Sequence, residues 1–301
     1  MLKILSIGGA SVDAYLNPKG KVKNVHIAGS AVNTAKNYKA LGFTSKARIW
    51  VGKDGNGKDI INNLVKNKIV TVYDALEGER SEHKILKNNK VVVENSDHLP
   101  QILREEDEKM IKSANWIHLS GLNSTPTSIN RVLLPALEAK AIPVTWSPGK
   151  KQIEAGFHSF EQLLSRTVVL TLNKGELLKF TRRRTLERAI QDILHTGVKI
   201  LVVTDHASIT RVISYNERFT ITPPHGKITD LQGVGDCWAS TFTAYAVTEF
   251  DIPKAMQLAT FHTKMLLEHE GADSAFVSKN DLEKKFKRVE KKYLVHVHKY
   301  M

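Results

Sequence analysis

The sequence predicts an α/β fold built around a mostly parallel sheet. Short runs of β-branched and apolar residues alternate with longer amphipathic stretches along the 301 residues. Several of the short runs are apolar throughout, as expected for strands covered on both faces. The regular strand–helix alternation favours right-handed crossover connections between parallel strands.

The expected elements follow from these periodicities in chain order. Core strands are predicted at residues 4–7, 47–51, 116–119, 142–146, 168–171 and 200–204. Amphipathic helices are predicted at residues 31–41, 58–67, 105–113, 127–139, 186–195, 236–248 and 253–269. The alternating residues 293–298 resemble an edge strand without an assigned function.

Two segments interrupt this alternation. Residues 21–27 form a short strand-like piece, and residues 84–95 predict a hairpin that turns at Asn88-Asn89. Both would leave the main sheet and form a small β lid from segments at about 14–28 and 83–96. Ligand sites in open α/β sheets lie at the carboxyl ends of the strands, so we expect the lid there.

Composition limits the classes of protein. A hydrophobic content of 42% allows one large domain or two smaller ones, and no apolar run approaches the roughly 20 residues that span a bilayer. Residues 1–8 read as a strand rather than a signal peptide. Cys237 is the only cysteine, which excludes intrachain disulfides and favours a reducing, cytoplasmic location.

The formal net charge of +13 could attract nucleic acid, membranes or polyanionic metabolites. The basic residues are scattered, and no helix-turn-helix, zinc-ligand or RNP-type pattern accompanies them. We therefore expect a solvated basic surface, with neither a nucleic-acid nor a membrane partner.

The segment Asp230-Leu231-Gln232-Gly233-Val234-Gly235-Asp236 is the strongest candidate site. Its glycines permit backbone angles that point consecutive N–H groups at one anion. A helix that starts at Val234 or Gly235 would add its unpaired N–H groups and dipole. A carboxylate at Asp236 beside a bound phosphate makes sense if it takes a proton. The segment therefore suggests phosphoryl transfer.

Other candidates are weaker alone. Asp13 follows the first strand and could bind substrate hydroxyls or occupy a turn. Gly29 and Asn33 start a helix where a ligand could approach closely, although a tight helix–sheet contact explains them too. Asn173 and Glu176 could hold phosphate or form a helix-capping pair.

Some chemistries lack support. The twelve histidines are dispersed without metal-ligand spacing. Cys237 lies in an apolar neighbourhood, which favours a buried thiol over a nucleophile. No Gly-Lys-Ser or Gly-Lys-Thr is present, so any nucleotide is held without a Walker loop.

The order of these elements resembles the ribokinase-like (PfkB) carbohydrate kinases along nearly the whole chain. The match comprises Asp13, the block from Gly29 to Asn33, the turn at residues 51–57, Asn173-Lys174-Gly175-Glu176 and residues 230–236. The resemblance implies a three-layer α/β domain over residues 1–301 with a β lid. It also implies transfer of the ATP γ-phosphoryl group to a substrate hydroxyl.

The resemblance assigns roles residue by residue. Asp236 matches the catalytic base, and the backbone N–H groups of Gly233, Val234 and Gly235 match the anion hole. The remaining assignments are Asp13, Gly29 and Asn33 to the acceptor, Asn173 and Glu176 to phosphate and Mg²⁺ through water, and Asp230 to a site for a monovalent cation such as K⁺.

The nucleotide loop departs from the family pattern. Thr204 is kept, but His206 and Ile209 stand where glycines normally make room for the nucleotide. Leu231 replaces a threonine and Val234 an alanine in the site segment. We therefore expect Thr204 and His206 to contact ATP in an altered way.

We interpret the chain as an ATP-dependent kinase of a small sugar. A nucleoside acceptor is the alternative, and it would need a base pocket to which Tyr15, Phe43 and Trp50 cannot be assigned. A non-catalytic homologue that binds a metabolite or nucleic acid is the rival from another class, supported by the altered nucleotide loop and the charge. We also consider a homodimer in which two copies of the chain meet through the lid.

Overall fold

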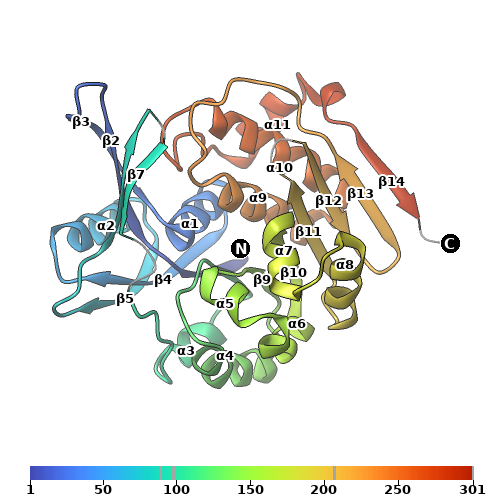
Figure 1. Cartoon of the computed structure of the whole chain (residues 1–301), viewed down its shortest axis with the longest axis horizontal. Coiled ribbons are helices and arrows are strands. Elements are labelled where there is room, and N and C mark those ends of the chain that lie inside the picture. Colours follow the sequence, from blue (N-terminus) through green and yellow to red (C-terminus); the bar gives the residue numbers. More distant parts are fainter. Residues whose placement is uncertain (89, 96–98, 206–207, 300–301) are drawn as a thin grey trace.

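A ten-stranded sheet runs through the computed structural model, which describes residues 1–88, 90–95, 99–205 and 208–299 (Figure 1). The strand order is β14-β13-β12-β11-β10-β9-β8-β1-β4-β5. Neighbours from β11 to β5 are parallel, and β11 to β14 are antiparallel. Their bounds are β1 Lys3–Gly8, β4 Thr44–Gly52, β5 Val70–Leu76, β8 Trp116–Ser120, β9 Val144–Ser147, β10 Thr167–Asn173, β11 Ile200–Asp205, β12 Ile209–Ile213, β13 Glu217–Ile221 and β14 Val295–Lys299.

Helices cover both faces of this sheet (Figure 1). One face carries α1 Ser30–Ala40, α2 Gly55–Lys66, α9 Val234–Glu249, α10 Ile252–Leu267 and, outside α10, α11 Lys279–Phe286. The other carries α3 Asp107–Lys112, α4 Pro126–Lys140, α5 Lys150–Ala155, η1 Phe157–Phe160, α6 Glu161–Arg166, α7 Lys174–Thr181 and α8 Leu186–His195. The short η2 Glu290–Lys292 precedes β14. The predicted α/β class with a mostly parallel central sheet is confirmed.

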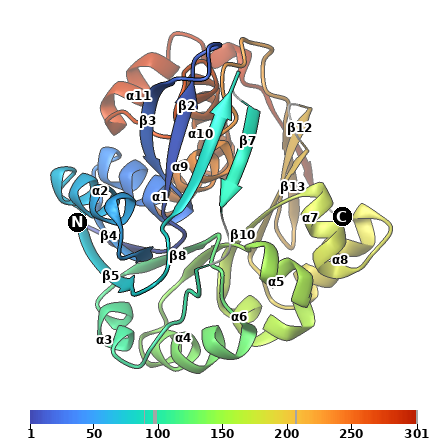
Figure 2. The ribbon, with the colours of Figure 1, turned by 60° about the vertical axis from the view of Figure 1, so that its left-hand side comes forward.

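A separate four-stranded sheet has the order β3-β2-β6-β7. It comprises β2 Ser11–Leu16, β3 Val22–Ala28, β6 Glu82–Lys87 and β7 Lys90–Asn95, and Figure 2 shows β2, β3 and β7 standing away from the large sheet. We call this sheet the lid. The predicted hairpin is present, with Ile85 opposite Val93 and Leu86 opposite Val91. Asn89 of its turn and residue 96 lie outside the described residues.

Local chemistry sets the helix boundaries. Asp54 caps α2 by accepting the Gly57 N–H at 2.8 Å, so this helix begins at Gly55, earlier than the periodicity predicts. The strand predicted from residue 142 begins at Val144, because the Ile142 N–H still bonds the Leu137 carbonyl at the end of α4. The remaining predicted core strands and helices are present, with shifts at their ends.

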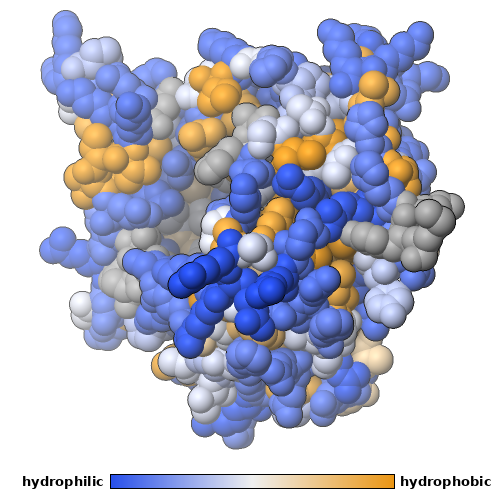
Figure 3. All heavy atoms as spheres, turned by 45° about the vertical axis from the view of Figure 1, so that its right-hand side comes forward, coloured by the Kyte–Doolittle hydropathy of each residue, from blue (hydrophilic) through white to orange (hydrophobic). Residues whose placement is uncertain are grey.

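The sheet edge beyond β11 shows what periodicity missed. β12 and β13 were not predicted, because their short mixed sequences ITRVI and ERFTI contain charged residues. The predicted edge strand at residues 293–298 is confirmed as β14, which pairs with β13. Hydrophilic residues predominate on the face seen in Figure 3, and apolar ones form separate patches. No helix in the described part of the chain is long and apolar enough to cross a membrane.

Candidate active site

Asp236 lies in the first turn of α9, where side chains from two other elements meet it. Asn33 of α1 donates from Nδ2 to Asp236 Oδ2 at 2.8 Å. Ser120, the last residue of β8, donates from Oγ to Asp236 Oδ1 at 3.3 Å. Burial raises the pKa of Asp236, while these two hydrogen bonds and the charge of Lys84 oppose the shift. The carboxylate is thus held in one orientation.

The N-terminus of α9 offers backbone N–H groups beside this carboxylate. Gly233 precedes the helix with φ 71° in the left-handed region, and no side chain in the described residues caps the helix start. A Cβ at Gly233 would lie 2.6 Å from Ala272 Cβ, whereas one at Gly235 would meet nothing within 4 Å. This open, uncapped helix start is suited to an anion.

Asp13 faces the same region from the lid strand β2. It is only 2% exposed, and burial raises its pKa to about 6 despite the opposing charge of Lys84 and a hydrogen bond from Ser11. Lys84 lies opposite Asp13 in the parallel pairing of β2 and β6. Its charge acts on both Asp13 and Asp236, and it pairs with Glu94 at 3.3 Å.

Gly29 and Asn33 have different geometric roles. Gly29 has φ 98°, and a Cβ there would lie 2.4 Å from Ala10 Cα, so the tight contact that the sequence allowed is present. Asn33 does not cap its helix. Its Nδ2 binds Asp236, and its buried Oδ1 has no hydrogen-bond partner in the described part of the chain.

A second group lies at the ends of β10 and β11. Asn173 and Thr204 are paired neighbours in register. Asn173 and Glu176 form a capping box on α7, with Glu176 N–H to Asn173 Oδ1 at 2.9 Å and Asn173 N–H to Glu176 Oε2 at 2.8 Å. Burial raises the pKa of Glu176. The capping alternative is therefore realised, and His206 lies outside the described residues.

Asp230 is a buried carboxylate, 3% exposed, four residues before the start of α9. Tyr15 of the lid strand β2 donates its hydroxyl proton to Asp230 Oδ2. The Gly271 N–H also donates to Oδ2, at 3.0 Å, and the Gln232 N–H donates to Oδ1 at 3.1 Å.

Three residues of this site were not among the predicted site residues. Lys84 appeared only as part of a hairpin, and its place opposite Asp13 follows from the register of β2 and β6. Ser120 directly follows the strand predicted at residues 116–119, and polar residues at the ends of parallel strands could have marked it. Tyr15 reaches Asp230 through a contact between distant segments, which no local pattern reveals.

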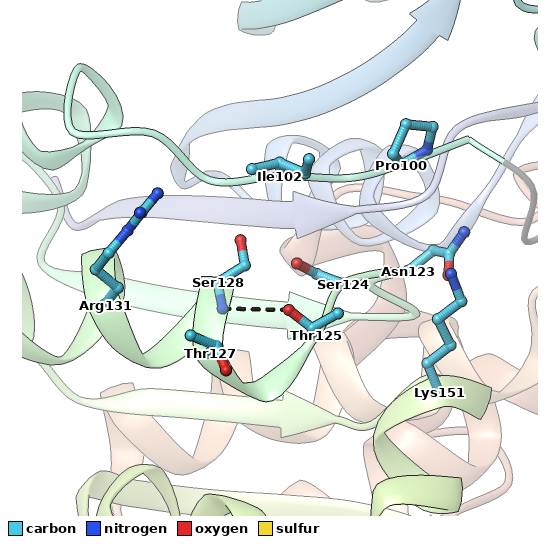
Figure 4. A pocket seen from close by; sticks show the side chains of 9 residues that line it. All are labelled: Pro100, Ile102, Asn123, Ser124, Thr125, Thr127, Ser128, Arg131 and Lys151. Carbon is cyan, nitrogen blue, oxygen red and sulfur yellow. Dashed lines mark hydrogen bonds between the residues drawn. The ribbon is translucent and has the colours of Figure 1, made fainter.

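A cavity of about 290 Å³ lies elsewhere, under the N-terminus of α4 (Figure 4). Arg131 and Lys151 flank it, and Thr125 Oγ1 caps the helix by accepting the Ser128 N–H at 3.3 Å. It contains none of the predicted site residues. Within the described ranges, no three His, Cys, Asp or Glu side chains gather as metal ligands would.

A mostly parallel sheet between two helix layers, with a small second sheet beside an uncapped helix start, defines the ribokinase-like α/β proteins. The chain belongs to the pfkB family of carbohydrate kinases, whose family model matches residues 1–280. It is therefore a phosphotransferase with an alcohol group as acceptor, in a family of sugar and nucleoside kinases.

Individual relatives are distant. The ATP-dependent ribose-1-phosphate kinase of Halopiger xanaduensis is 24% identical over 254 residues, which cover 82% of each chain. An Escherichia coli chain solved in complex with ATP and Mg²⁺ is 20% identical with a TM-score of 0.79, over 96% of this chain and 100% of that one. The Arabidopsis thaliana ribokinase complexed with ribose and ATP is 17% identical with a TM-score of 0.75, over 95% and 99%. These structures support the fold.

Proposed function

We propose that the chain transfers the γ-phosphoryl group of ATP to a hydroxyl of a small sugar. The observation that carries this proposal is the position of Asp236, hydrogen-bonded by Asn33 and Ser120 beside the uncapped start of α9. A proton acceptor and an anion-binding helix start are the two groups that phosphoryl transfer to an alcohol requires.

In this mechanism Asp236 takes the proton of the attacking hydroxyl. Burial makes its carboxylate more basic, while the hydrogen bonds from Asn33 and Ser120 keep it oriented. The N–H groups of Gly233, Val234 and Gly235 stabilise negative charge on the transferring group. The base and the donors come from one helical turn, so their spacing is fixed by the backbone.

The acceptor binds between the lid and α1. Asp13 accepts hydrogen bonds from its hydroxyls, and the unpartnered Asn33 Oδ1 accepts another. Gly29 lets the start of α1 approach the Gly9-Ala10 backbone between β1 and β2. The positive charge of Lys84 favours the ionised forms of both Asp13 and Asp236, so both carboxylates can serve a neutral substrate.

ATP binds across the ends of β10 and β11, beside the neighbouring residues Asn173 and Thr204. The sequence assigns His206 to the same nucleotide, and it lies outside the described residues. The capping box uses Glu176 Oε2, which leaves Oε1 for a water bound to Mg²⁺. Mg²⁺ held there would neutralise charge on the ATP phosphates.

The aromatic side chains favour a sugar over a nucleoside. Phe43 is buried against Tyr38, and Trp50 is buried with the Arg48 guanidinium 4.2 Å from its ring centroid. Tyr15 is 1% exposed and bound to Asp230. None of the three is available to stack on a base.

The test is ADP release from ATP across a panel of sugars, sugar phosphates and nucleosides. Asp236→Asn should lower kcat by about 10²-fold or more, because the proton acceptor is lost. ATP affinity should stay within a few-fold. Asp59→Asn, an exposed carboxylate on α2, is the matched control and should keep full activity. An Asp236→Asn enzyme as fast as this control, or one that loses only ATP affinity, would contradict the assigned role.

We propose further that the chain dimerises through the lid. Apolar side chains on β3 and β7 support this, since they are largely exposed: Val22, Val25, Val91, Val92 and Val93.

A further inference from the structure

The lid touches the loop that precedes the anion-binding helix at one buried point. Tyr15 of β2 donates its hydroxyl proton to Asp230, which begins the residues 230–233 leading into α9. Tyr15 is 1% exposed and Asp230 is 3% exposed. Asp13, two residues before Tyr15, points to the same face of the strand. One strand therefore reaches both the acceptor and this loop.

The groups around the Asp230 carboxylate are hydrogen-bond donors. Its Oδ2 accepts from Tyr15 and from the Gly271 N–H, and its Oδ1 accepts from the Gln232 N–H. A buried carboxylate is stabilised by such donors. A carboxylate offers about four lone-pair sites, and three donors leave Asp230 about one for a cation, which needs several oxygen ligands. This donor set does not fit the monovalent cation that the sequence resemblance assigned to Asp230.

Tyr15 is held in place from the other side. The His26 ring of β3 packs edge-on against it, with ring centroids 5.3 Å apart. Two further lid contacts reach Glu270, from Lys23 Nζ at 3.2 Å and from Asn24 Nδ2 at 2.6 Å. Burial and the neighbouring Asp230 raise the pKa of Tyr15, so its hydroxyl stays a donor.

We infer that Tyr15 is a positioning residue that joins the lid to the anion-binding loop and replaces a monovalent cation at Asp230. This inference rests on the proposed function. The hydrogen bond from Tyr15 orients Asp230, and Asp230 in turn holds the N–H of Gln232, one residue before Gly233. Acceptor bound at Asp13 therefore stabilises the loop through β2, without a bound K⁺.

The first measurement compares wild type in potassium chloride and in tetramethylammonium chloride at equal ionic strength. The expected result is kcat equal within twofold in the two salts, and no melting shift specific to K⁺. A several-fold activation by K⁺, or a specific rise in melting temperature, would overturn the inference. The melting measurement needs no turnover and no variant, so it decides the cation question even if no acceptor is phosphorylated and the proposed function fails.

The second measurement uses Tyr15→Phe, with Lys23→Ala as the control that breaks a different lid contact. Tyr15→Phe should lower kcat about ten- to a hundredfold, the effect of losing a hydrogen bond to a charged group. The KM for ATP should change less than threefold. The control should keep kcat within threefold of wild type. If Tyr15→Phe matches the control, or raises only KM, Tyr15 does not position the loop.

Discussion

Gly233 and Gly235 lie at the start of α9, and replacing each of them in turn by alanine separates the effect of backbone strain from that of helix propensity. Gly233→Ala places a Cβ at φ 71°, which costs about 1–2 kcal/mol for a left-handed residue. That Cβ would also lie 2.6 Å from Ala272 Cβ, and overpacking of this kind costs about 1–3 kcal/mol. The free energy of unfolding should fall by about 3 kcal/mol.

Gly235→Ala is the matched control, because its Cβ meets nothing within 4 Å. Alanine is favoured over glycine in a helix by about 0.5–1 kcal/mol, so this variant should be slightly more stable. Urea unfolding followed by circular dichroism measures both. Equal stability changes in the two variants, or a loss below about 1 kcal/mol for Gly233→Ala, would refute the strain at Gly233.

Two more predictions concern Asp13 and the lid. In the folded chain the pKa of Asp13 is about 6, whereas the ordinary value is 3.8. The contribution of Asp13 to the free energy of unfolding should therefore fall by about 3 kcal/mol as the pH rises from about 4 to 6. Asp13→Asn should make the pH dependence of urea unfolding shallower than in the Asp59→Asn control, and a slope equal to that of the control would contradict the assignment. If the lid forms the dimer contact, Val92→Asp should shift sedimentation towards the monomer, whereas Val65→Asp on α2 should not. If the two variants sediment alike, the lid is not the dimer interface.

The fold could be predicted where burial is recorded in the sequence. Residues 200–204 and 168–171 are apolar because helices cover both faces of their strands, so periodicity identified them. β13 lies near the sheet edge and carries Glu217 and Arg218, so nothing in its pattern distinguished it from a loop.

The site was predictable where one short segment carries the chemistry. Asp236 and the glycines before it share a helix start, whereas Asn33 was assigned only through the resemblance to the family. Lys84 and Tyr15 depend on the lid's strand register and on contacts between distant segments, which residue spacing does not encode. Glu176 fitted both a phosphate-binding and a helix-capping role, and the structure shows that it accepts the Asn173 N–H as a cap.

The parallel pairing of β2 with β6 has a consequence for the order of folding. Between these strands lie β3 of the lid and then α1, β4, α2 and β5, which belong to the large sheet and its helix layer. Closing so long a loop costs more entropy than pairing local hairpins, so β2 and β6 gain little until that intervening unit has folded. The hydrogen bonds between β2 and β6 should therefore be the last in the N-terminal half to acquire hydrogen-exchange protection during refolding.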